Sequence, residues 1–266
     1  MDSRFPLPRS LNRRIWRAIV EFDLLRPGDR VLVGFSGGKD SAFLLYALRS
    51  LQLHNRRVPF TLAAVTLDAG FRPDYPPASM GEFLKDLGVE WHLIRTALAA
   101  GLANRKDPCA RCAYLRRGAI CRLARELGFN RVALAHHHDD AVETFLLSLF
   151  YAGKLQTFRP KTELRGGLSL IRPLVYLREA EIRRHLGLLG FDPVPSGCPH
   201  EGHTHRRKVK ELLHRLCREN RFVYTNLAAA MRIPSASVEL WPPMPCREKL
   251  QAAYRLFFGG AEGEEE

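Results

Sequence analysis

The stretch Val31–Ser41, VLVGFSGGKDS, decides the fold. Its apolar first half predicts a short buried strand, and the glycines after it predict a tight turn into a helix that begins near Asp40. Such a turn offers successive backbone N–H groups and the positive end of a helix to an anion. Lys39 adds a full charge, and Ser36 and Ser41 add hydroxyl donors. The stretch therefore predicts a polyphosphate site.

The spacing of this turn separates it from the commonest phosphate loop. It is shorter than the G-x-x-x-x-G-K-S/T pattern, so it is not that motif. The structural alternative is a plain strand-to-helix turn in which Asp40 complements the helix dipole. A complete Ser-Gly-Gly-Lys-Asp-Ser directly after a buried strand is far more specific than a bare glycine pair, and this favours the phosphate site.

Strands and helices alternate beyond this unit. They predict an α/β fold, a mostly parallel twisted sheet with helices on both faces and helical N- and C-terminal extensions. The expected strands are 31–35, 60–67, 90–95, 131–135 and 168–174, and the expected helices are 10–25, 40–51, 79–88, 109–127, 139–151 and 178–189. We expect a basic N-terminal helix over 1–28, a nucleotide-binding domain over 29–192, a Cys/His loop with C-terminal helices over 193–232, and an irregular tail over 233–266, packed back or disordered.

Polar residues follow three of the expected strands: the phosphate turn, Asp68, and the run His136–Asp140. The carboxyl ends of parallel strands meet at one edge, so these residues are expected to converge on one crevice. Asp139 and Asp140 then predict a Mg²⁺ site that faces the phosphates. The alternatives are that Asp139 only caps a helix and that Asp68 only shapes a turn.

The charge balance predicts a polyanionic partner. Lys and Arg outnumber Asp and Glu by 41 to 28, which gives a formal net charge of +13. Nucleic acid is the commonest such partner, and a merely solvated basic surface is the alternative. No apolar run of roughly 18 residues occurs and the N-terminus lacks a secretory signal, so we expect no membrane span and a cytoplasmic location.

The six cysteines favour thiol or metal chemistry over disulfides. Cys109 and Cys112 form a CxxC pair at the start of a helix, where the helix lowers a thiol pKa. Cys198 lies far from this pair in the sequence, in a Pro- and Gly-rich loop that is suited to exposing a thiol. Three thiolates can hold zinc with a histidine, or three irons of a 4Fe–4S cluster. The histidines considered are His200, His203 and His205, and the cysteines without an assigned role are Cys121, Cys217 and Cys246.

The phosphate turn and the His136–Asp140 run together resemble the two motifs of the PP-loop ATP pyrophosphatase superfamily. The resemblance implies cleavage of ATP between the α- and β-phosphates, with Mg²⁺. It implies catalytic roles for Lys39, Asp139 and Asp140, and an ATP site made of Ser36, Gly37, Gly38, Lys39, Asp40, Ser41, Asp68 and His136.

Three further segments narrow the resemblance to the tRNA 2-thiocytidine synthetase branch: 109–118, 150–154 and 171–174. That branch implies a tRNA thiolase that adenylates a base oxygen, at C2 of an anticodon-loop cytidine, and replaces it with sulfur. It also implies a 4Fe–4S cluster on Cys109, Cys112 and Cys198, with zinc as the weaker alternative. This chain departs from the branch in one respect, since it has a single cysteine where a second CxxC is usual.

The basic clusters and the resemblance together predict tRNA contacts at Arg116, Arg117, Lys154, Arg206 and Arg207. A sulfur donor such as sulfide or a cysteine desulfurase is implied, and the oligomeric state is left open, a homodimer included. Two rival hypotheses stand beside the thiolase. One is a lysidine synthetase-like enzyme that uses an amine nucleophile, and the other is a zinc-stabilised RNA-binding protein.

Overall fold

A computed structural model describes residues 4–55, 57–102, 108–195, 197–199, 205–232, 241 and 245–258. Its centre is a six-stranded sheet in the order β3-β2-β1-β4-β6-β5. All neighbouring strands run parallel except β5 and β6, which are antiparallel. The strands are β1 (Arg30–Gly34), β2 (Thr61–Asp68), β3 (Glu90–Arg95), β4 (Arg131–Ala133), β5 (Lys161–Glu163) and β6 (Ser169–Ile171).

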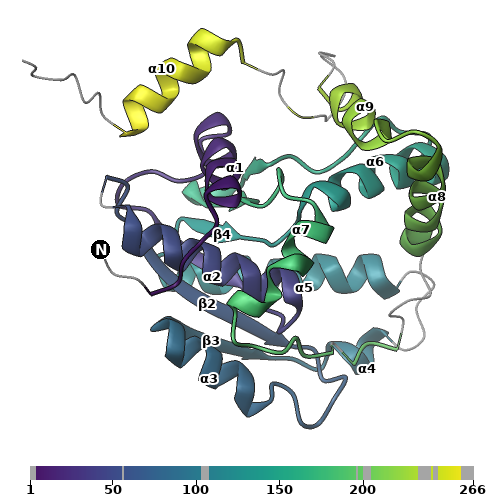
Figure 1. Cartoon of the computed structure of the whole chain (residues 1–266). Coiled ribbons are helices and arrows are strands. Elements are labelled where there is room, and N and C mark those ends of the chain that lie inside the picture. The colour runs from purple at the N-terminus through teal and green to yellow at the C-terminus, as the bar shows by residue number, and fades with distance from the viewer. Residues whose placement is uncertain are drawn as a thin grey trace, which may run out of the picture.

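Helices pack on both faces of this sheet, as predicted (Figure 1). The described helices before the 193–205 region are α1 (Arg9–Glu21), α2 (Lys39–His54), α3 (Ala78–Leu87), α4 (Leu98–Leu102), α5 (Pro108–Glu126), α6 (His138–Ala152) and α7 (Glu179–Arg184), with 3-10 turns η1 (Arg165–Gly167) and η2 (Leu186–Leu188). After it come α8 (His205–Glu219), α9 (Val223–Ala230) and α10 (Arg247–Phe258).

Side-chain alternation along β1 produces two cores. Val31 and Val33 point into a large core with α1, α2 and α7, whereas Leu32 points to the opposite face and packs against α5. Both sides of the strand are buried, which explains its continuous apolar sequence. Helix α1, assigned from sequence to a separate N-terminal segment, buries Leu11 and Ile15 in the large core.

The strand order places a topological switch point between β1 and β4. From β1 the chain proceeds outward through β2 and β3, and it then returns to add β4 and β6 on the other side. Ligands of open α/β sheets bind at the carboxyl ends of the strands that flank such a point. The phosphate turn follows β1 and the His136–Asp140 run follows β4. The fold therefore brings the two motifs together, as the sequence predicted.

Each expected strand and helix is present, with shifted ends. Helix α1 ends at Glu21 because Phe22 forms its C-cap and Asp23 turns to a positive φ of 50°. The expected helix over 178–189 is only α7 followed by η2. Three elements were not foreseen: helix α4, helix α10, and strand β5, which adds an antiparallel edge.

The tail expected to be irregular over 233–266 contains helix α10. Apolar residues recur along it at helical spacing, and Phe258 packs edge-on against Trp16 of α1 with ring centroids 5.1 Å apart. Figure 1 shows α10 lying across α1. This long-range contact covers an apolar side of α10 that would otherwise face water. Within the described residues, no helix combines the length and the apolar character needed to cross a membrane.

Candidate active site

The phosphate turn is a tight, internally hydrogen-bonded loop. Ser41 Oγ donates to the Gly38 carbonyl over 2.9 Å and accepts from Ser36 N–H over 3.2 Å. Gly37 has a φ of +74°, and a Cβ there would lie 2.9 Å from Met80 Sδ, so glycine is required at that position. Helix α2 has Gly38 as its N-cap residue, which provides no capping side chain. Its backbone donors are therefore available to an anion.

A cavity of about 560 Å³ opens in front of this turn. Its size is typical of a pocket for a nucleotide-sized ligand. The phosphate turn contributes one wall, through Ser36, Gly38, Asp40 and Ser41. A second wall is apolar and includes Val65, Leu67, Ile120 and Leu134. Four arginines also line the cavity: Arg116, Arg117, Arg172 and Arg206. The cavity can thus hold a flat apolar ring system together with several negative charges.

Lys39 lies beside the cavity but is not among its lining residues. Its Nζ is 2.7 Å from Asp40 Oδ2 and 3.1 Å from Glu179 Oε1 of α7. Burial alone would lower the pKa of Lys39, but the charges and hydrogen bonds of the two carboxylates raise it. Lys39 therefore carries a full positive charge beside the phosphate turn.

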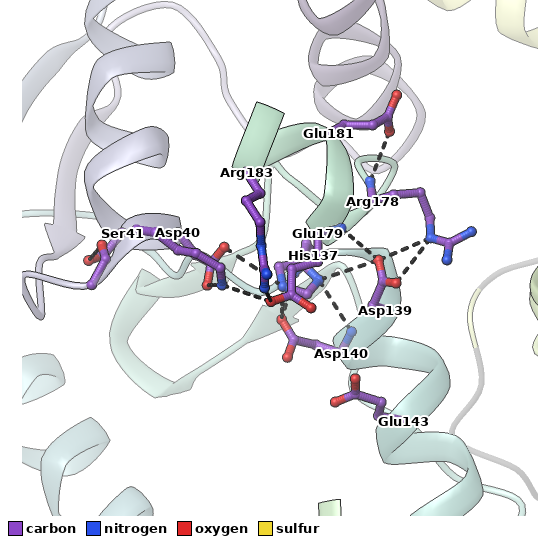
Figure 2. Close-up of polar contacts among 12 residues, drawn as sticks. Asp40, Ser41, His137, Asp139, Asp140, Glu143, Arg178, Glu179, Glu181 and Arg183 are labelled. Carbon is purple, nitrogen blue, oxygen red and sulfur yellow. Dashed lines mark hydrogen bonds and ion pairs between the residues drawn. The ribbon is translucent and has the colours of Figure 1, made fainter. Parts of the chain in front are cut away.

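The two adjacent aspartates point in different directions (Figure 2). Asp140 lines the cavity, and its Oδ2 accepts a hydrogen bond from His137 N–H over 2.9 Å. Asp139 is buried outside the cavity lining, where it accepts bonds from Arg178 Nε over 3.1 Å and from Glu179 N–H over 2.8 Å. Its carboxylate thus holds the N-terminus of α7. Of the two acids expected to face the phosphates, only Asp140 lines the cavity.

His136 contributes a half-buried, neutral imidazole to the cavity. Burial lowers its pKa to about 4, and its Nδ1 has no hydrogen-bond partner among the described residues. His137 instead caps α6, with its Nδ1 accepting from Asp140 N–H. Only His136 of the three neighbouring histidines lines the cavity, in agreement with the motif.

Asp68 ends β2 outside the cavity lining. Its Oδ1 accepts a hydrogen bond from Gly70 N–H over 2.8 Å, and its carbonyl accepts from Thr96 N–H over 2.9 Å. This geometry is that of a turn-forming aspartate. The neighbouring residues Val65 and Leu67 reach the cavity instead.

Arg172 is a site residue that sequence reasoning did not single out. Its side chain is buried at 4% exposure and lines the cavity. Its Nη1 donates to neutral oxygens of Arg159 and Thr162, and its Nε has no partner within the described part of the chain. Burial lowers the pKa of Arg172 to about 10, so the group stays charged at neutral pH. Its position directly after β6 is the sequence signal that identifies it.

A second, smaller cavity of about 140 Å³ lies at the N-terminus of α5. Its lining brings together Cys109, Cys112 and Cys198, the last from a loop distant in sequence. Gly197 allows this approach, because it has a φ of +66° and lies so close to Arg72 that a Cβ would clash. Val194 N–H also donates to the Gly37 carbonyl over 2.9 Å, which ties the loop to the phosphate turn.

The pKa of one cavity thiol differs from the expectation that the helix would lower it. The pKa of Cys109 is raised, first by burial and then by the neighbouring Cys198 and Cys112, rather than lowered by the helix. No three Cys, His, Asp or Glu side chains within the described ranges are grouped closely enough to bind a single metal ion. Of the three histidines considered as zinc ligands, His205 packs against Tyr151 with ring centroids 4.3 Å apart. His200 and His203 lie outside the described residues.

The residues predicted to contact tRNA do not form one cluster. Arg116 and Arg117 of α5 and Arg206 of α8 line the large cavity. Arg206 also contacts Asp140, Glu143 and Thr144 of α6 at 3.1–3.3 Å. Arg207 forms an exposed pair with Glu211, and Lys154 lies exposed after α6.

These features define a nucleotide-binding α/β protein whose phosphate turn precedes a helix at the switch point of the sheet. Residues 9–192 match the family model of the PP-loop domain. The chain is 36% identical over 250 residues to the tRNA-cytidine(32) 2-sulfurtransferase of Cupriavidus taiwanensis, with 90% of this chain and 80% of the relative covered. It is 38% identical over 235 residues to the protein of the same name from Pelobacter propionicus, with 85% and 86% covered. The chain therefore belongs to the PP-loop family, in its tRNA-cytidine(32) 2-sulfurtransferase branch.

A solved structure supports the fold. The U34-tRNA thiolase NcsA from Methanococcus maripaludis, described with its 4Fe–4S cluster, superposes with a TM-score of 0.69 at 19% identity. The match covers 95% of this chain and 79% of that one. At this identity the likeness confirms the predicted architecture of the sheet and its helices.

Proposed function

We propose that this protein uses ATP to replace the oxygen at C2 of a tRNA cytidine with sulfur. The family is that of ATP-dependent tRNA sulfurtransferases, and the cytidine follows from the names of the relatives. One observation carries the proposal. Helix α5 brings Cys109 and Cys112 to the small cavity and, one turn further along, Arg116 and Arg117 to the large one. A single helix therefore connects the cysteine cavity with the proposed nucleotide cavity.

In this proposal the large cavity binds ATP. The backbone amides of the phosphate turn and the N-terminus of α2 hold the phosphates, with Lys39 as a charged partner. The apolar wall around Val65 and Ile120 receives the adenine. Arg172 offers its uncompensated charge to a phosphate, because a buried guanidinium without a carboxylate partner is stabilised by an anionic ligand.

We assign the Mg²⁺ ligand to Asp140, because Asp139 already caps α7. Mg²⁺ is bound preferentially by carboxylate oxygens together with substrate phosphates. Asp140 faces the cavity, and a second carboxylate, Glu143, lies three residues later on the same helix. When bound, the ion would reduce the negative charge on the departing pyrophosphate.

Two bond exchanges complete the reaction. The base oxygen attacks the α-phosphorus of ATP, the bond to the β-phosphate oxygen breaks, and pyrophosphate leaves. Sulfide-level sulfur then adds to C2, and the C–O bond breaks with release of AMP. Arg116 and Arg117 lie where their charges can stabilise the α-phosphate during both exchanges. The apolar wall around Val65 and Ile120 keeps water from that side of the adenylate, which water would otherwise hydrolyse.

The thiol donor set fits a 4Fe–4S cluster better than a zinc ion. Three thiolates on separate irons stand farther apart than three ligands of one zinc, and the cysteines share a cavity without the close grouping a single ion needs. Cys109, Cys112 and Cys198 would hold the cluster, which supplies an iron with an open coordination position able to carry sulfur. Sulfide or a cysteine desulfurase is the proposed external donor.

Nucleoside mass spectrometry of tRNA from a deletion strain tests the reaction. We expect 2-thiocytidine to disappear and to return with the intact gene. Unchanged 2-thiocytidine would refute the proposal, and loss of an amine-modified cytidine instead would support the lysidine synthetase-like rival. Anaerobic purification with iron and zinc analysis tests the donor set, since stoichiometric zinc without iron contradicts the cluster.

A further inference from the structure

The outer side of α5 borders a groove of about 690 Å³ that the proposed chemistry does not use. Its other walls come from Thr96 and Leu98 after β3 and from Thr162 and Leu164 of the β5–β6 hairpin. Arg117 lines both this groove and the ATP cavity. The two hollows therefore adjoin, and a chain bound in the groove has one end at the nucleotide.

The charge of this surface is almost entirely positive. Helix α5 contains five arginines and a single acidic residue, its last, Glu126. Arg122 and Arg125 are exposed in the groove. Arg125 donates only to the carbonyls of Cys121 and Arg165, and no carboxylate pairs with either arginine within the described parts of the chain. Guanidinium groups that lack acidic partners are suited to phosphates.

An exposed aromatic ring lies on the same wall. Tyr114 is 63% exposed, and the guanidinium of Arg111 lies 5.6 Å from its ring centroid. A ring that projects beside arginines provides a stacking surface for an unpaired base. Duplex RNA keeps its bases stacked inside the helix, so this ring favours a single-stranded segment.

We propose that this α5 groove binds a single-stranded segment of the RNA substrate and leads it to the ATP cavity. Arg122 and Arg125 bind consecutive phosphates, and Tyr114 stacks on one base. Arg117 lies at the junction, where the segment meets the nucleotide. The assignment rests on the proposed function, because it takes RNA as the substrate and names where the RNA lies.

Filter binding of unmodified tRNA over a salt series tests the groove. The double variant Arg122→Gln/Arg125→Gln is expected to bind about tenfold more weakly near 0.1 M salt, with a slope of log K against log salt that is shallower by about 1–2. Tyr114→Leu is expected to weaken binding about tenfold at all salt concentrations, whereas Tyr114→Phe retains the ring and the affinity.

A matched control removes two charges from the opposite face of the sheet. Arg13→Gln/Arg184→Gln changes exposed arginines of α1 and α7 and is expected to bind tRNA as the unaltered protein does. Equal weakening by both double variants would overturn the groove assignment, and so would wild-type affinity in the α5 variants. Circular dichroism and ATP binding check that each variant is folded.

This test is independent of the chemistry proposed above. If the unaltered protein binds tRNA through the groove but leaves cytidine unthiolated, the groove stands and the proposed reaction fails. If thiolation occurs and the α5 variants bind and react normally, the reaction stands and the groove fails.

Discussion

Arg206 donates a hydrogen bond to Asp140 over 3.3 Å, and this contact ties α8 to the first turn of α6 at the edge of the ATP cavity. The same guanidinium lies 3.1 Å from Glu143 Oε2. Burial raises the pKa of Glu143, while Arg206 opposes that shift. A cation is thus already placed where the proposed Mg²⁺ would bind, so binding of the ion requires Arg206 to move or to share Asp140.

Substitution of the two neighbouring aspartates is predicted to have separable effects. Asp140→Asn should abolish Mg²⁺-dependent ATP cleavage with little loss of stability. Asp139→Asn should lower the free energy of unfolding by about 1–3 kcal/mol, because Arg178 and the N-terminus of α7 lose a charged acceptor. Urea unfolding and ATP cleavage over a Mg²⁺ series measure the two effects. An Asp139→Asn protein with normal stability and no Mg²⁺ response would contradict this assignment.

Arg172 is predicted to serve the nucleotide rather than the fold. Arg172→Met removes a buried charge that has no acidic partner in the described residues, so its unfolding free energy should change by less than about 1 kcal/mol. The KM for ATP should rise about tenfold or more, because the phosphates lose a charged donor. Steady-state pyrophosphate release gives the KM for ATP. The Arg172→Lys variant should have a KM between those of the unaltered protein and Arg172→Met. A large loss of stability at unchanged KM would show a structural role.

The unfolding free energy is predicted to fall at low pH partly through Glu179. Burial alone would raise its pKa, but hydrogen bonds and charges of Lys210 and Lys39 lower it to about 2 from 4.5. The stabilisation is therefore full above about pH 4.5 and is lost as the pH falls toward 2. Glu179→Gln should remove about 1–2 kcal/mol at pH 7 and flatten the acid limb of a Tm-versus-pH curve. An unchanged acid limb would rule out this linkage.

The three cysteines of the small cavity are predicted to bind iron as a set. Anaerobic preparations of Cys109→Ser, Cys112→Ser or Cys198→Ser should lose most of their iron and their visible absorption, yet bind ATP normally. Cys246→Ser is the matched control, since Cys246 is exposed and lies outside this cavity. Iron retained by all three cavity variants, or lost equally from the control, would argue against the assignment.

Sequence could predict the cavity but not the orientation of its side chains. The phosphate turn was recognisable because its residues are contiguous, and the switch point then placed His136 opposite it. Asp139 and Asp140 could not be distinguished, because their directions depend on α7, whose N-terminus packs against Asp139 from a distant part of the chain. Asp68 was assigned by its strand end, yet its carboxylate is engaged with Gly70 N–H.

The features that escaped prediction depend on long-range packing. The position of Arg172 after β6 makes it a candidate among the 41 Lys and Arg residues, but its role becomes apparent only from its burial beside the cavity. Helix α10 forms where its aromatic residues reach Trp16 of α1. The local sequence pattern around Arg172 or α10 does not show which distant residues each will contact. A single sequence therefore indicates candidate residues but not their long-range contacts.

Helix α5 has a further consequence for how this protein can vary. The helix fixes the spacing between Cys112 and Arg116. Over these four residues it advances roughly 6 Å and makes slightly more than one turn. Insertion of one residue between them would rotate Arg116 by about 100° away from the large cavity. If the proposed function holds, substitutions along this segment can be tolerated, but its length is set by the distance between the three-cysteine cavity and the large cavity.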